Sequence, residues 1–287
     1  MRQLSLKAVL CCCLLFSCSE EESSLTTTDP RLIIRLNFDP NQQRLDNLGR
    51  PAIIPDGNAA QTPLVREMSA HYIEFAPSAF TQLGEGGVIY QGKETNEGGT
   101  PAIDFQEAFL AGDGEVLINR PLSSLSPGSY QWVRVSLTYQ EGDIQVLING
   151  NELSGTLASF VGFNTYITDF NLNEQTIEVN GNRLQGFWAF EAMGFTEKGQ
   201  APEGATTVPN PLFQSSPIPE GSCVLTGKFA QPFVVTGNET EDITVSLSFS
   251  TNNSFEWTDI NEDGKYEPGI GEQLVDMGLR GLIPAVS

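Results

Sequence analysis

The sequence predicts an all-β protein, an antiparallel β-sandwich that carries a strand-linked calcium loop near its C-terminus. Short apolar runs recur along the chain, and several alternate with polar residues at the period of two that marks a half-buried strand. Turn residues separate these runs, with 28 glycines and 17 prolines among 287 residues. No apolar pattern of helical period extends over a useful length beyond the N-terminal leader. Many short strands between turns are typical of sandwiches.

The first expected strand is Arg31–Asp39 (RLIIRLNFD), because every second residue in it is leucine, isoleucine or phenylalanine. The same reasoning gives further strands at Met68–Phe75, Val88–Tyr90, Val116–Ile118, Trp132–Tyr139, Ile144–Ile148, Tyr166–Leu172, Ile177–Val179, Gln185–Glu191, Cys223–Phe229 and Ile243–Phe249. At most, single helical turns are expected near Ser78–Gln82 and Pro121–Leu125.

Three short motifs predict turns between these strands. Asn149-Gly150 and Asn180-Gly181 are the dipeptides that two-residue hairpins prefer. Glu141-Gly142-Asp143 is expected to separate two strands. The Pro- and Gly-rich stretch Gly199–Pro219 is interpreted as a long loop, so residues 30–287 are expected to form one sandwich domain.

The N-terminus has the pattern of a lipoprotein signal peptide over residues 1–17. Arg2 and Lys7 flank the start of a short apolar run, which is too short to span a bilayer as a helix. The sequence LFSC at Leu15–Cys18 resembles a bacterial lipobox. This resemblance implies cleavage before Cys18 and attachment of acyl chains, such as palmitate, to that cysteine.

Residues 18–29 are expected to be an acidic flexible tether, since they hold almost no large apolar side chains. Glu20, Glu21 and Glu22 directly follow the expected lipidation site and resemble the acidic surface-export signal of Bacteroidetes lipoproteins. The expected location is therefore the bacterial outer membrane, lipid-anchored and surface-exposed. A solubilising tether on a periplasm-facing lipoprotein is the alternative.

The segment DINEDGKYEPGIGE contains a candidate calcium site over residues 259–272. Asp259, Asn261 and Asp263 supply oxygen ligands at alternate positions, and Gly264 follows where a tight turn needs positive φ. The carbonyl of Lys265 falls at the seventh position. The pattern resembles dockerin-type and other extracellular Asp-x-Asn-x-Asp-Gly loops. The alternative is a polar turn, because these residue types are common in turns.

The acid that would complete this loop is displaced from its usual place. An EF-hand closes with glutamate at position twelve, but here that position is Ile270. Glu272 follows two residues later, and Gly269 and Gly271 would let the chain curl back so that Glu272 reaches the ion. Asp276 is the second choice. Trp257, two residues before Asp259, is expected to support the loop.

Charge and composition exclude several other functions. The formal net charge of −21 repels phosphates, so nucleic-acid binding is excluded. His71 is the single histidine, expected to be a hydrogen-bonded core residue, so no catalytic triad is indicated and we do not expect an enzyme. Cys223 would be the one cysteine left after cleavage and lipidation, and it is expected to be buried.

The three tryptophans leave two interpretations open. Trp132, Trp188 and Trp257 could form a platform that stacks on sugars, but each lies in an apolar run where core packing is the usual role. Together with the calcium loop, these features favour a binding or structural module of the cell envelope. Its ligand would be a glycan or a protein, and its membrane contact would be the lipid anchor.

Three short motifs between the first strand and Glu191 are similar to the methanobactin-associated copper-binding (MbnP-like) lipoproteins. They are Asn37-Phe38-Asp39, His71-Tyr72-Ile73-Glu74 and Pro127–Tyr130. The resemblance implies a lipidated β-sandwich and an alternative function, the handling of copper or another transition metal through His71. An enzyme acting on polysaccharide is a third alternative.

Overall fold

The structure, a computed structural model, describes residues 29–202, 205 and 222–287. The expected signal peptide, Cys18 and the tether up to Thr28 lie outside these residues, as does most of the stretch 199–219. Within them the chain forms β-strands joined by turns and 3₁₀ segments, which confirms an all-β, sandwich-like fold. None of the described helices is long and apolar enough to cross a membrane.

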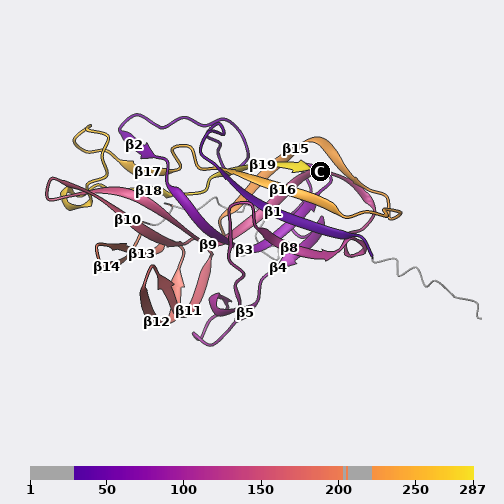
Figure 1. Ribbon diagram of the computed structural model, residues 1–287, viewed down its shortest axis with the longest axis horizontal. Helices are drawn as coiled ribbons and strands as arrows, with labels where there is room; N and C mark the ends of the chain where they lie inside the picture. The colour runs from indigo at the N-terminus through magenta and orange to yellow at the C-terminus, as the bar shows by residue number, and fades with distance from the viewer. Residues whose placement is uncertain (1–28, 203–204, 206–221) are drawn as a thin grey trace, which may run out of the picture.

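The largest sheet is built along one long strand, β9 (Gly128–Ile148). β3 (Leu64–Ala76) pairs with one edge of β9, whereas β15 (Val224–Val235) and β10 (Asn151–Phe160) divide the other edge between them. The sheet extends beyond these strands to β13 (Phe187–Ala192), β14 (Phe195–Gln200), β4 (Gly87–Gln91) and β7 (Ala111–Gly112). β9 therefore joins the two ends of the molecule (Figure 1).

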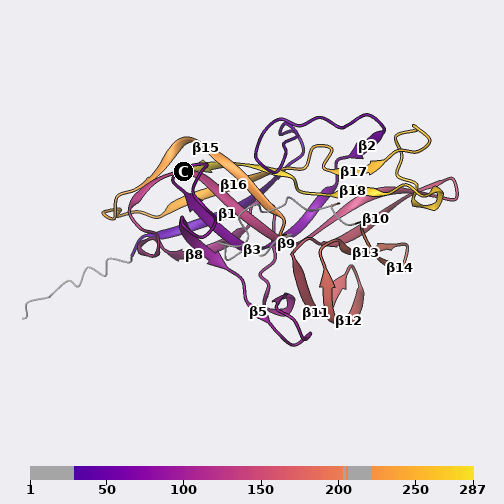
Figure 2. The same cartoon turned by 180° about the vertical axis from the view of Figure 1, so that it is seen from behind.

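Three smaller sheets pack around this one (Figures 1 and 2). The first consists of β19 (Gly281–Val286), β16 (Ile243–Ser250), β1 (Arg31–Asp39) and β8 (Val116–Pro121). The second consists of β12 (Gln175–Leu184), β11 (Asn164–Leu172), β6 (Ala102–Asp104) and β5 (Glu94–Thr95). The third consists of β18 (Leu274–Met277), β17 (Phe255–Thr258) and β2 (Asn58–Gln61).

Each smaller sheet encloses its own apolar cluster against the large sheet. The first cluster, around Phe75 and Phe249, fills the sandwich between β3, β9 and β15 on one side and β1 and β16 on the other. The second surrounds Phe160 beneath β11 and β12. The third lies between β9, β10 and the β17–β18 pair, and contains Phe255 and Trp257. This third cluster supports the candidate calcium loop.

The expected turn at Glu141-Gly142-Asp143 is wrong, because β9 continues through it without a break. Gly142 allows a close approach to β3, since a Cβ there would lie 2.9 Å from the carbonyl oxygen of Leu64. The two acids are paired rather than solvated. Tyr139 donates to Glu141 at 2.7 Å, and Arg66 lies 2.9 Å from Asp143. Polar residues with partners in the sheet thus produce a sequence pattern that looks like a turn.

Asn180-Gly181 is also not the hairpin expected, because β12 runs through it. Asn180 has φ of 49°, and the pairing with β11 shifts register opposite it, so the dipeptide forms a β-bulge. The turn between β11 and β12 lies instead at Asn173, which has φ of 52°. The other dipeptide, Asn149-Gly150, forms the expected two-residue hairpin between β9 and β10.

The strands are mostly but not wholly antiparallel. β1 pairs with β16, and β6 with β11, in the parallel direction. Alternation of apolar and polar residues determines which face of a strand is buried, but it contains no information about the direction of the neighbouring strand.

Candidate calcium loop

The candidate loop connects β17 to β18 and is held by three backbone hydrogen bonds, one that closes its base and two that attach it to the rest of the protein. Thr258 N donates to Gln273 O at 2.9 Å, which closes the base of the loop. Asp259 N donates to Gly57 O at 2.9 Å. Leu147 N, near the end of β9, donates to Tyr266 O at 2.7 Å. The loop is therefore held against the large sheet through its own backbone.

Aromatic packing fixes the loop from beneath. The ring centroid of Tyr266 lies 5.5 Å from that of Trp257 and 5.3 Å from that of Phe255, the latter in an edge-to-face arrangement. Trp257 is only 1% exposed. The expected supporting role of Trp257 is thus confirmed, and core packing is its role.

Inside the loop, the candidate ligands accept hydrogen bonds from the backbone of the loop itself. Gly264 N donates to Asp259 Oδ2 at 2.9 Å, Asp263 N to Asn261 Oδ1 at 3.3 Å, and Lys265 N to Asp263 Oδ1 at 2.9 Å. Gly264 has φ of 72°, the left-handed turn expected of it. These bonds curl the segment so that successive ligand residues follow one tight arc.

One buried carboxylate oxygen in this arc has no partner. Asp259 Oδ1 is buried and accepts no hydrogen bond from any described residue. Burial of an unpaired carboxylate oxygen is costly, because the water that it has lost is not replaced. A hydrogen-bond donor, a water or a cation can partner such an atom.

Glu272 folds back onto the start of the loop. Its side chain is buried, and its two oxygens accept hydrogen bonds from Ile260 N at 3.1 Å and from Glu267 N at 2.6 Å. Burial raises the pKa of this carboxyl, and the charges of Asp259 and Asp263 raise the pKa further, against the effect of the two backbone bonds.

The glycine after Ile270 makes this return possible. Gly271 has φ of 97°, in the left-handed region, and ends the 3₁₀ turn η4 (Pro268–Ile270). Ile270 itself is 44% exposed and takes no part in the loop interior.

The carboxylates of the loop do not yet converge on a single point. Across residues 29–202, 205 and 222–287, no three His, Cys, Asp or Glu side chains gather as a metal-holding group. Such a group would omit the Asn261 amide and the Lys265 carbonyl, two of the five expected ligands. The Lys265 ammonium points away from the loop to Glu152, 2.6 Å away.

Asp276, the second choice for the closing acid, belongs to a different cluster. It lies 3.1 Å from Arg280 Nε, and Arg280 in turn lies 2.8 Å from the buried Glu256, which also pairs with Arg44. Burial raises the pKa of Asp276 to about 7. Sequence reasoning missed this cluster, because Arg44 and Glu256 are brought together only by the fold.

His71 and Cys223 both lie in the interior of the protein. His71 is 1% exposed at an irregularity of β3, and its Nε2 lies 3.1 Å from Glu94 Oε1. Cys223 is buried, as expected, and burial raises the pKa of its thiol to about 12. Trp132 and Trp188, unlike Trp257, are only half-buried, so core packing does not fully account for them.

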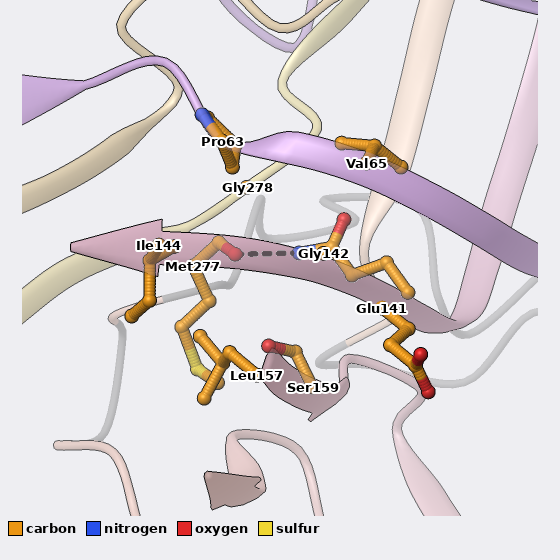
Figure 3. Close-up of a pocket in the computed structure, with 10 residues that line it drawn as sticks. Pro63, Val65, Glu141, Gly142, Ile144, Leu157, Ser159, Met277 and Gly278 are labelled. Atoms are coloured by element: carbon orange, nitrogen blue, oxygen red, sulfur yellow. Dashed lines mark hydrogen bonds between the residues drawn. The ribbon is translucent and has the colours of Figure 1, made fainter. Parts of the chain in front are cut away.

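A small cavity at the C-terminal end of β18 shows how the C-terminal segment is attached (Figure 3). It measures about 10 Å³, room for one water at most. The Gln140 side chain at its wall donates to Met277 O at 2.8 Å and accepts from Leu279 N at 3.0 Å. This amide therefore holds the backbone on both sides of Gly278. The cavity is too small for a ligand.

Comparison with known proteins gives no further assignment: no protein-family model, curated protein or solved structure matches this chain.

Proposed function

We propose that this protein is a cell-envelope lipoprotein whose β-sandwich is a binding or structural module stabilised by one calcium ion. The ligands would be Asp259, Asn261, Asp263, the Lys265 carbonyl and Glu272. The anchor would be Cys18, which is the last residue of the lipobox-like sequence LFSC. A surface location on the outer membrane would place the domain where calcium is abundant and where a glycan or protein ligand can reach it.

The observation that carries the calcium proposal is the buried, unpaired Oδ1 of Asp259 in a loop onto which Glu272 folds back. The charges of Asp259 and Asp263 act against that of Glu272, and calcium prefers carboxylate, amide and carbonyl oxygens of this kind. An ion would offset the repulsion and supply Asp259 Oδ1 with its missing partner. The expected role is structural: the ion would fasten β17 to β18 and keep Tyr266 against the third core cluster.

Thermal unfolding of residues 19–287 with and without calcium tests this proposal. A ligand present at about 100 times its Kd adds ~2.7 kcal/mol of stability, which for a domain of this size is a rise in Tm of roughly 5–10 °C. Asp263→Ala should abolish the rise. Glu262→Gln is the matched control, because it removes one negative charge from the same loop without touching a ligand. A calcium effect that survives Asp263→Ala would refute the assignment.

The anchor requires a separate test on the full chain expressed in a bacterium that processes lipoproteins. The wild-type protein should partition into the detergent phase of a Triton X-114 extract, and Cys18→Ser should move it to the aqueous phase. Partition that does not depend on Cys18 would exclude the lipid anchor while leaving the calcium proposal intact.

A further inference from the structure

An apolar pocket of about 350 Å³ lies directly beside the calcium loop. One wall is the face of the large sheet that carries Leu157 and Phe190. The opposite wall is formed by Phe255 of β17 and Tyr266 of the loop. Ligand pockets commonly enclose roughly 300–1,000 Å³ and are lined mainly by apolar and aromatic side chains. The pocket therefore has the size and lining of a small-molecule site.

Two glycines make room for the aromatic rings of this pocket. A Cβ on Gly155 of β10 would lie 2.3 Å from Cζ of Phe190, and a Cβ on Gly199 of β14 would lie 2.4 Å from Cζ2 of Trp188. Neither glycine has a positive φ, so the backbone conformation does not require glycine at these positions. Both rings stay half-buried and lie close over the neighbouring strands. They form an aromatic floor to the pocket.

The charged group at the pocket is Glu197 of β14, which is exposed. Within the described part of the chain, its carboxylate has no hydrogen bond and no ion pair. The nearby lysines are engaged elsewhere: Lys198 donates to the carbonyl of Glu178 at 3.4 Å, and Lys265 pairs with Glu152. An unpaired carboxylate beside aromatic faces favours a cation, and the net charge of −21 attracts cations to the whole surface.

A larger groove of about 740 Å³ between β15 and β19 is a weaker candidate, because two of the three acids that line it, Glu239 and Asp242, already have partners. The Glu239 carboxylate accepts from Thr236 N at 2.5 Å and from Gly237 N at 3.0 Å. Asp242 accepts from Arg31 N at 2.7 Å. These acids stabilise their own loop and the start of β1.

We propose that the pocket beside the loop binds a small organic cation with an apolar body, such as an arylalkyl amine. The apolar body would rest on Trp188 and Phe190, and the ammonium group would lie at Glu197. Burial of the body supplies most of the affinity, and the carboxylate and the aromatic faces select for positive charge. The site is distinct from the proposed calcium site, because none of the five expected calcium ligands lines the pocket.

Three probes that share a phenylethyl group and differ in their terminal group test the inference. 2-Phenylethylamine is a cation at neutral pH, 2-phenylethanol is neutral, and 3-phenylpropionate is an anion. Binding to residues 19–287 is measured by titration calorimetry, with saturation-transfer NMR for weak cases. The amine should bind about three- to tenfold more tightly than the alcohol, and the anion most weakly.

Two variants of pocket residues and one control variant locate the binding. Glu197→Gln should reduce the affinity for the amine to that of the alcohol, while Glu97→Gln, which removes an exposed acid from the loop between β5 and β6, should change neither. Ile148→Trp at the half-exposed rim should weaken binding of all probes, with Tm unchanged. Equal affinities for amine and alcohol, an unchanged preference in Glu197→Gln, or no binding of the amine would each overturn the proposal.

Discussion

Gln140→Leu should cost about 2–5 kcal/mol of folding stability, an unusually large effect for one polar side chain. The amide of Gln140 makes hydrogen bonds of 2.8 and 3.0 Å to Met277 O and Leu279 N. Met277 and Leu279 are each 3% exposed, and the adjoining cavity has room for one water at most, so water cannot replace both bonds. Leaving a buried donor or acceptor without a partner costs roughly 1–3 kcal/mol, and the leucine leaves one of each. The free energy of unfolding from urea denaturation measures the loss.

Gln145→Leu is the matched control for that prediction. Gln145 lies in the same strand, β9, but its side chain is exposed, so the same substitution should change stability by no more than ~0.5 kcal/mol. Amide hydrogen exchange supplies a second measurement, because Leu279 N should lose protection in Gln140→Leu. A cost below about 1 kcal/mol, or a cost equal to that of the control, would refute the idea that this amide fastens the C-terminal segment.

Three further predictions concern separate parts of the molecule. Burial raises the pKa of Asp276 from 3.8 to about 7, so the stability that the protonated carboxyl contributes below pH 4 is lost as the pH rises through 7. Asp276→Asn should reduce this loss by ~1–3 kcal/mol, as measured by urea unfolding at successive pH values. A loss that is the same in the variant and the wild type would contradict the raised pKa. Cys223 should not react with a thiol reagent at pH 8 until the protein is unfolded, because its thiol is buried; rapid labelling of the folded protein would show that the site opens. Met193→Asn should add ~0.5–1 kcal/mol of stability, since Met193 is 78% exposed and has φ of 54°, which asparagine tolerates better; a loss of stability would point to a packing role for the methionine.

Sequence periodicity was sufficient to predict the fold class and most strands, because the alternation of apolar and polar residues that buries one face of a strand lies within the sequence of that strand. It was not sufficient for β9, where Gly142 allows close contact with β3 instead of a turn. It also missed the bulge at Asn180, since an Asn-Gly pair suits any position that needs positive φ. Strand direction, as in the parallel pair β1 and β16, depends on partners that are distant in the sequence.

The candidate calcium loop was visible in the sequence because its ligands follow one another at fixed spacing. The structure adds the return of Glu272 and the unpaired oxygen of Asp259. The pocket beside the loop could not be predicted in this way. Its walls come from β9, β10, β13, β14, β17, β18 and the loop, and no local pattern in the sequence brings Glu197 and Tyr266 together.

Metal content tests the central claim most directly. Residues 19–287, purified and dialysed without chelator, should contain about one calcium and no copper per chain by mass spectrometry. Asp263→Ala should contain none, and Glu262→Gln should match the wild type. Stoichiometric copper, or no calcium in a folded protein supplied with millimolar calcium, would contradict the account and make His71 or a simple polar turn the better explanation.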